Sequence, residues 1–238
     1  MAKKAIVAIG GNSLIRDKDH KTIPDQYAAT KETCKHIADM IQDGWDVVIT
    51  SGNGPQVGFI LRRSEIAESE LHPVPLDYCG ADTQGAIGYM IERAMYNEFH
   101  YRNMDKHVAA IVTQVRVSKD DPAFEDPAKP IGSFMNEKDA KKKADDEGWI
   151  VKEDSGRGWR RVVASPIPKE IIELPAIKTL IENGIVVYAV GGIVRDVPLF
   201  NIFRGVWPFL FAMLIAMVIL LAFPQISLWL PSIMRPGI

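Results

Sequence analysis

Apolar and polar positions along the chain alternate in blocks that predict strands and helices in turn. Apolar residues spaced by three and four positions run from Tyr27 to Ile41, which is typical of an amphipathic helix. The same spacing predicts further helices over 80–98 and 171–183. Continuous apolar runs, typical of strands buried on both faces, occupy 4–9, 46–49, 108–113 and 185–190. This order predicts a mainly parallel α/β sheet covered by helices.

Residues 118–168 interrupt this alternation and predict an inserted subdomain. A proline-rich passage around 129–134 precedes a charged helix over 136–147, whose lysine run is typical of a solvated face. The segments 149–152 and 159–163 then flank a glycine-containing turn, and this pattern predicts a β-hairpin.

Glycine-rich turns follow the first two predicted strands. Gly10, Gly11 and Asn12 end the first, and the stretch from Thr50 to Gly58 ends the second. Because a strand, helix, strand unit places both turns at the same sheet edge, their backbone N–H groups are expected to surround an anion such as a phosphate. The alternative is a pair of plain turns. Neither turn has the GxGxxG or GxxxxGK[ST] spacing, so neither a Rossmann dinucleotide site nor a P-loop is predicted.

The sequence predicts less about a third glycine turn and about the start of the helix expected over 80–98. Gly191 and Gly192 follow the last predicted strand, at the same expected edge as the first two turns. Asp77 and Asp82 stand before or at the start of the helix predicted over 80–98, where a helix N-cap is as good an interpretation as a ligand role.

The last forty residues differ in composition from the rest of the chain. No charged residue occurs from Gly205 to Met234, and the apolar run 206–223 would reach about 27 Å as a helix, close to the thickness of a bilayer core. Trp207 and Trp229 suit its interfaces. The run predicts a transmembrane segment, and a buried core helix is the alternative.

The net charge and the placement of the cysteines and histidines give no indication of nucleic-acid binding, a disulfide framework or a metal site. The net charge is −2, so no global basicity indicates nucleic acid as a partner. Two distant cysteines, Cys34 and Cys79, indicate free thiols in a reducing compartment rather than a disulfide framework. The five histidines form no tight cluster, so no metal site is predicted from protein ligands.

Five stretches together resemble the carbamate kinases of the amino acid kinase family. The resemblance spans about residues 3–196, and the stretches that carry it are Ala8–Leu14, Thr50–Gly58, Cys79–Gly85, Lys129–Gly132 and Gly158–Pro166. It implies a three-layer αβα sandwich that forms a homodimer in the cytoplasm. It also implies reversible phosphoryl transfer between ATP, with Mg²⁺, and carbamate, giving carbamoyl phosphate, in arginine and nitrogen metabolism.

The resemblance also implies roles for individual residues. Lys129 in the inserted subdomain, Gly11 and Asn12 are expected to be catalytic, with Lys129 reaching the carbamoyl phosphate. Without its Lys-Pro-Ile-Gly context, Lys129 would be taken for a solvated loop lysine. The resemblance assigns ATP or ADP to Gly191 and Gly192, and substrate binding to Gly10, Gly11, Ser51, Gly52, Asn53, Gly54 and Lys129.

The tail departs from this pattern. Family members continue into a second half that carries most of the nucleotide site, whereas here the tail resembles the end of a large TRAP-type transporter permease subunit. The expectation is a truncated kinase-like domain over 1–196 joined to a membrane-anchoring tail over 197–238, with impaired activity. The alternatives are an inactive, membrane-tethered fusion product and a permease fragment.

Overall fold

The computed structural model describes residues 3–17 and 19–190, apart from the side chain of Asn12, together with a few helical residues of the tail. These tail residues are Phe211, Met213, Leu214, Ile215, Met217, Ile219 and Leu220. The chain divides into two compact units, Met1–Gly192 and Ile193–Ile238. Gly191, Gly192 and most of the apolar run 206–223 lie outside the described residues. Within the described part, no helix is both long enough and apolar enough to span a bilayer.

The first unit alternates strands and helices along the sequence. In chain order its elements are β1 (Lys3–Ile9), η1 (Gly11–Leu14), α1 (Ile23–Gln42), β2 (Trp45–Ser51), α2 (Gly54–Ala67), α3 (Leu76–Tyr101), β3 (Val108–Ile111), β4 (Val115–Arg116), η2 (Pro122–Phe124), β5 (Lys129–Met135), α4 (Glu137–Glu147), β6 (Val151–Glu153), β7 (Trp159–Val163), β8 (Glu170–Ile171), α5 (Leu174–Glu182) and β9 (Val186–Ala189).

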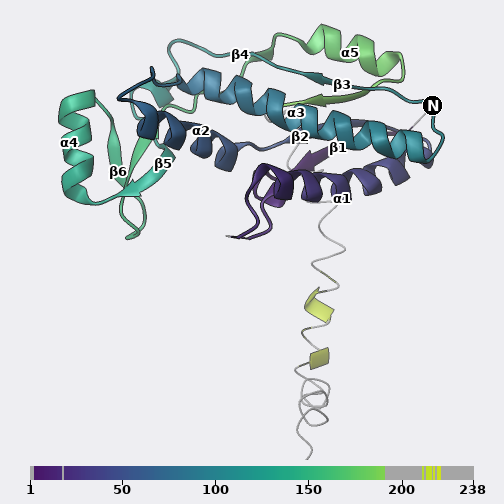
Figure 1. Ribbon diagram of the computed structural model, residues 1–238, viewed down its shortest axis with the longest axis horizontal. Helices are drawn as coiled ribbons and strands as arrows, with labels where there is room; N and C mark the ends of the chain where they lie inside the picture. Colours follow the sequence, from purple (N-terminus) through teal and green to yellow (C-terminus); the bar gives the residue numbers. More distant parts are fainter. Residues whose placement is uncertain are drawn as a thin grey trace, which may run out of the picture. The chain divides into compact units, whose positions relative to one another are not determined.

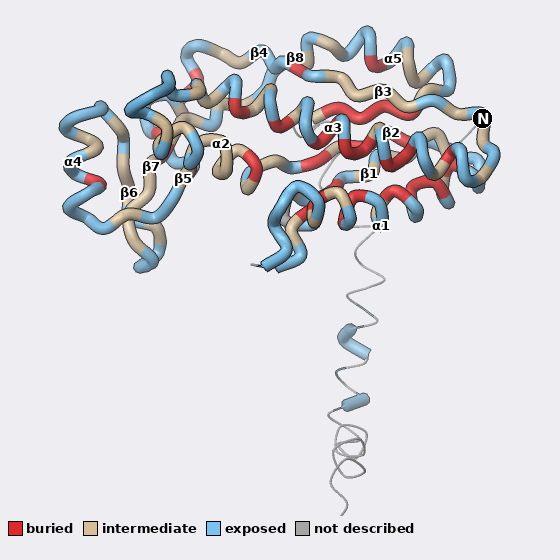
Figure 2. The backbone as a smooth tube through the Cα atoms, viewed as in Figure 1, coloured by how far each residue is buried: buried red, intermediate tan, exposed pale blue. Residues whose placement is uncertain are grey.

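The main sheet is parallel throughout, with strand order β1-β2-β9-β3. Helices α1 and α3 pack against each other and cover one face, and α5 packs on β9 (Figure 1). Along β9, Val186 and Tyr188 enter the core under α1 and α3, whereas Val187 and Ala189 enter a smaller core under α5. This pairing confirms the predicted parallel α/β fold. Its inner strand β9 is buried along its whole length, as expected for a strand covered by helices on both faces (Figure 2).

Local chemistry fixes where α1 begins. The Thr22 hydroxyl accepts from the N–H of Asp25, and the Asp25 carboxylate accepts from the N–H of Thr22 at 2.9 Å, which is a capping box. Pro24 stands in the first turn, where its missing N–H costs no hydrogen bond. From there the buried positions recur at helical spacing up to Ile41, as the sequence predicted.

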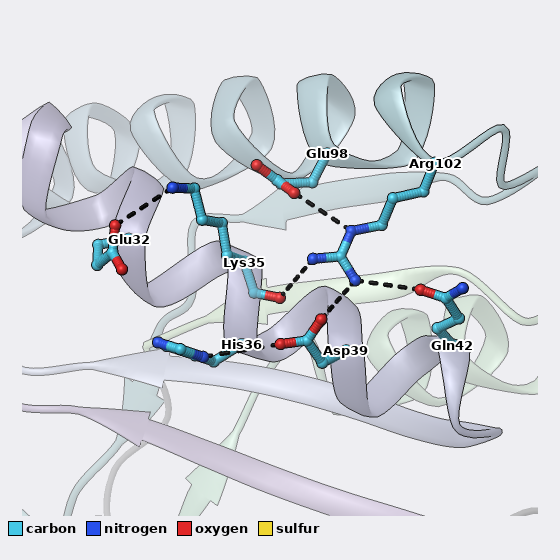
Figure 3. Close-up of polar contacts among 7 residues, drawn as sticks. All are labelled: Glu32, Lys35, His36, Asp39, Gln42, Glu98 and Arg102. Carbon is cyan, nitrogen blue, oxygen red and sulfur yellow. Dashed lines mark hydrogen bonds and ion pairs between the residues drawn. The ribbon is translucent and has the colours of Figure 1, made fainter.

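A salt-bridge network joins the ends of α1 and α3, far along the chain from each other. Arg102, just past the end of α3, donates to the Asp39 carboxylate at 2.7 Å, to the Gln42 side chain at 3.2 Å and to the Lys35 carbonyl at 3.0 Å, while its Nε donates to Glu98 (Figure 3). The hydrogen bond to Asp39, foremost, raises the pKa of Arg102. One guanidinium therefore holds two helices in register.

The inserted segment forms a separate antiparallel sheet, with order β5-β7-β6, and α4 packs on it. The predicted hairpin is present as β6 and β7, and the predicted charged helix as α4. A short antiparallel pair, β4 and β8, joins the two ends of this insertion.

Two helix predictions differ from the structure. Residues 54–58, predicted as part of the second glycine turn, form the start of α2, because Pro55 occupies the first turn of a helix rather than ending one. Helix α3 begins at Leu76 instead of 80, with Pro75 at the N-cap, so neither Asp77 nor Asp82 caps it. Both residues lie inside the helix.

Candidate functional site

The two glycine turns lie beside each other at the carboxyl edge of the sheet. Strands β1 and β2 pair in parallel up to Ile9 opposite Ser51, so both chains leave the sheet at the same level. The N–H of Gly52 then donates to the carbonyl of Ile9 at 2.9 Å. This edge is where open α/β sheets bind their ligands.

Gly11 and Gly52 approach each other so closely that a side chain at either position would push the two turns apart. A Cβ on Gly11 would lie 3.0 Å from the carbonyl carbon and oxygen of Gly52, and a Cβ on Gly52 would lie 3.0 Å from the nitrogen of Gly11. The groups in the way are backbone atoms, which cannot rotate aside as a side chain can. The predicted glycines are therefore needed to bring the two turns together.

Asn53 precedes α2 but does not cap it. Its side-chain amide donates instead to the hydroxyl of Thr83 in α3 at 2.8 Å, and that hydroxyl donates to the carbonyl of Gly80 at 2.8 Å. The N–H groups of Gly54 and Gln56, in the first turn of α2, consequently have no side-chain cap. These N–H groups and the helix dipole give the edge a partial positive charge.

The Ser51 side chain points into the protein. Its hydroxyl and the Tyr188 hydroxyl lie 2.8 Å apart in a buried hydrogen bond. Burial raises the pKa of Tyr188 to about 12, and the hydrogen bond from Ser51 opposes that shift. Ser51 thus anchors the second glycine turn to the middle of the sheet, and any contact that it makes with a ligand would use its backbone.

Helix α3 also fixes the neighbouring strand ends. The Gln84 side chain accepts from the N–H of Thr113 at 2.8 Å and donates to its carbonyl at 3.2 Å. The Thr113 hydroxyl donates to the carbonyl of Val190. Through Thr83 and Gln84, one turn of α3 sets the ends of β2, β3 and β9.

A cleft of about 540 Å³ separates the glycine turn from the inserted sheet. Asn53 and Gly54 line one side, and Lys129 and Arg160 line the other. Lys129 is the first residue of β5 and is exposed. The structure therefore places the predicted lysine across a cleft from the predicted glycine turn, with two cations and one helix N-terminus lining the same space.

The other predicted site residues divide into two groups. Gly10 and Gly11 lie at the edge described above, and the Gly10 carbonyl accepts from the N–H of Ser13 at 2.8 Å, closing the first turn. The backbone of Asn12 belongs to η1, but its side chain lies outside the described part, as do Gly191 and Gly192. Over the described ranges, no group of three or more His, Cys, Asp and Glu residues is arranged to hold a metal ion.

Three residues of this region were not predicted from the sequence. Thr83 and Arg160 belong to stretches that carried the family resemblance, but no pattern in those stretches distinguishes them from their neighbours. Tyr188 lies in an apolar strand, where a tyrosine is most simply a packing residue. Only the fold brings each of them to its polar partner.

Comparisons with known proteins agree on one family. The model of the "Amino acid kinase family" matches residues 3–206. The carbamate kinase of Pyrococcus horikoshii is 48% identical over 195 residues, covering 81% of this chain and 62% of the relative. The carbamate kinase-like protein YahI of Escherichia coli is 48% identical over 196 residues, covering 81% of this chain and 61% of the relative.

Solved structures show the same likeness. Carbamate kinase from Giardia lamblia bound to AMP-PNP has a TM-score of 0.73 and 41% identity, covering 81% of this chain and 61% of that one. The chain thus spans about three fifths of the length of the relatives it matches. The family match ends at residue 206, and the expected likeness of the tail to a transporter permease gains no support from these matches.

Proposed function

Because this chain belongs to the amino acid kinase family, we propose that it takes part in phosphoryl transfer of the carbamate kinase type, between ATP and carbamate. The cleft between the second glycine turn and the inserted sheet would hold the carbamoyl phosphate. The observation that carries this proposal is the position of Lys129, which lines the cleft opposite Asn53 and Gly54.

The residues of the cleft suit a doubly charged phosphoryl group. Phosphoryl transfer depends on holding the reactants in line and on stabilising the charge that spreads over the equatorial oxygens. The backbone N–H groups of Gly54, on the cleft wall, and of Gly11, in the neighbouring turn, would donate to those oxygens, and the N-terminus of α2 adds its dipole. The Gly52 N–H is bonded to the Ile9 carbonyl and would hold the two turns together. The Gly11 and Gly52 contact makes this arrangement rigid before the substrate arrives.

Lys129 would supply the mobile charge. As an exposed lysine on the opposite wall of the cleft, it can move its ammonium toward a phosphoryl oxygen without displacing a partner that the described structure gives it. An ammonium there lowers the energy of the transition state as negative charge shifts between the carbamate and phosphoryl oxygens.

Among the residues that the structure describes, no group of three or more His, Cys, Asp and Glu residues could hold a metal ion. ATP as the phosphoryl donor is supported by the Giardia lamblia relative, which was solved with AMP-PNP. The roles of Mg²⁺, Gly191 and Gly192 stay predictions, and so do the cytoplasmic location and homodimerisation.

Calorimetric titration of the full chain with carbamoyl phosphate tests the proposal, alongside a coupled assay of ATP formation from ADP. Lys129→Ala should weaken binding at least tenfold by removing the charge facing the turn. Lys142→Ala removes an exposed lysine of α4 that does not line the cleft, and serves as the matched control with unchanged binding. Equal binding by the Lys129→Ala variant and the unsubstituted chain would refute the proposed site.

A further inference from the structure

The inserted sheet has an irregularity three residues after Lys129. In the pairing of β5 with β7, Ile131 lies opposite Arg161 and Met135 opposite Trp159. Three residues of β5, 132–134, therefore face Arg160 alone. Gly132 takes a left-handed backbone conformation there, with φ of +67°, which favours glycine.

The Arg160 side chain holds this bulge together. Its Nη2 donates to the carbonyl of Gly132 at 3.0 Å, and its Nη1 donates to the Asp154 carboxylate at 3.3 Å. The guanidinium also lies over the ring of Phe134, 5.0 Å from its centre. The bulge takes the Gly132 carbonyl out of the regular strand pairing, and the Arg160 guanidinium replaces the missing strand N–H as its hydrogen-bond donor.

Arg160 is well placed to affect the ligand site. It lines the same cleft as Lys129, and its side chain is only 21% exposed. Its Nε is buried and has no hydrogen-bond partner among the residues that the structure describes. In the described sheet β5 is an edge strand, paired with β7 on one side and packed against α2, so no second strand fixes its course between Lys129 and the bulge.

Resting on the proposed function, we propose that Arg160 is the positioning residue for Lys129: its bridge from Asp154 to the Gly132 carbonyl fixes the bulge in β5 and so fixes where Lys129 meets the phosphoryl group. In this proposal Arg160 acts through Lys129, because each of its terminal nitrogens donates to a group of the inserted subdomain.

Arg157 provides a matched control within the same hairpin. It also donates to Asp154, at 2.9 Å, and also lies over Phe134, at 5.3 Å. Unlike Arg160, it is 65% exposed, does not bond Gly132 and does not line the cleft. Both variants remove a cation beside Asp154, but only Arg160→Ala also removes the hydrogen bond to the Gly132 carbonyl. A difference between them therefore reports on that hydrogen bond.

The first measurement is amide hydrogen exchange in the full chain without ligand. Arg160→Ala should speed exchange in the peptides covering 129–135 about tenfold or more, and Arg157→Ala should leave them within about twofold of the unsubstituted chain. This measurement needs no substrate, so it tests the positioning role even if carbamoyl phosphate does not bind. Unchanged exchange in Arg160→Ala would overturn the inference.

The second measurement is a double-mutant cycle on carbamoyl phosphate affinity. Arg160→Ala should weaken binding about five- to tenfold in the unsubstituted chain and have no further effect in the Lys129→Ala background. A residue that binds phosphate independently, or that only stabilises the fold, would show the same loss in both backgrounds, and that result would overturn the inference. No binding by the unsubstituted chain, with faster exchange in Arg160→Ala, would refute the proposed function but not the positioning role.

A conservative variant guards against loss of folding. If circular dichroism shows that Arg160→Ala does not fold, Arg160→Lys takes its place in both measurements. An ammonium can reach the Gly132 carbonyl or Asp154 but cannot bridge both with the geometry of a guanidinium, so exchange and affinity should fall between the two extremes. Full retention of both properties by Arg160→Lys would contradict a role for the bridge.

Discussion

Replacing Gly11 with alanine should force the two glycine turns apart. The new Cβ would lie 3.0 Å from the carbonyl carbon and oxygen of Gly52, whereas ordinary carbon contacts in protein interiors begin near ~3.5 Å. The turns would have to separate by a few tenths of an ångström, straining the hydrogen bond from Gly52 to the Ile9 carbonyl. Overpacking of this kind lowers the free energy of unfolding by about 1–3 kcal/mol.

Urea unfolding followed by circular dichroism measures that change, and two further variants sharpen it. Gly52→Ala should cost a similar amount, and the double variant should cost less than the sum of the two, because the turns need to separate only once. Gly54→Ala is the control: beyond its chain neighbours and the backbone of its own helix, a Cβ there would meet no atom within 4 Å, so the free energy of unfolding should stay within about 1 kcal/mol. Fully additive losses, or an equal loss from Gly54→Ala, would show that the close approach of Gly11 and Gly52 is not what limits stability.

Four further predictions concern the supports of the site and the core. Gly88→Ala would place a Cβ 2.7 Å from an alanine of β3 and should destabilise by about 1–2 kcal/mol, whereas Gly85→Ala, with open space in the same helix, should stabilise by about 0.5–1 kcal/mol in thermal melts. Thr83→Val should lower the free energy of unfolding by about 1 kcal/mol and weaken carbamoyl phosphate binding, since the Asn53 side-chain amide would lose its hydrogen-bond acceptor. Arg102→Ala should cost about 1–2 kcal/mol in urea unfolding, because α1 and α3 lose their shared charged donor. Burial raises the Tyr188 pKa from 10.0 to about 12 on folding. The stability that depends on this shift is fully present below pH 10 and should be lost as pH rises through 12. The urea midpoint of the Tyr188→Phe variant should therefore fall less steeply at alkaline pH than that of the unsubstituted chain.

Local patterns were enough to predict the frame of the site. The apolar runs that became β1 and β2 each end in glycine, and parallel pairing then requires the two turns to share an edge. The helix between them follows from the apolar spacing between Tyr27 and Ile41. These features depend on neighbours in sequence, which is why they could be inferred before the fold was known.

The supports of the site depend on contacts that sequence spacing does not reveal. The Ser51 and Tyr188 hydroxyls meet across 137 residues of chain, and Asn53 and Thr83 across 30. The bulge at Gly132 exists only because β5 pairs with β7 in a shifted register. Helix α2 was missed for a different reason: a glycine and a proline indicate a turn equally well, and only the packing of α2 on α3 and β5 selects a helix.

A titration of the isotopically labelled full chain with carbamoyl phosphate, followed by amide chemical shifts, tests most directly where the phosphoryl group binds. The largest shifts should fall on Gly54 and Lys129, which line opposite walls of one cleft, and on Gly11 in the neighbouring turn, and Lys129→Ala should greatly reduce them. Shifts confined to other surfaces, or no saturable shifts in the folded chain, would contradict the claim that this cleft holds the phosphoryl group.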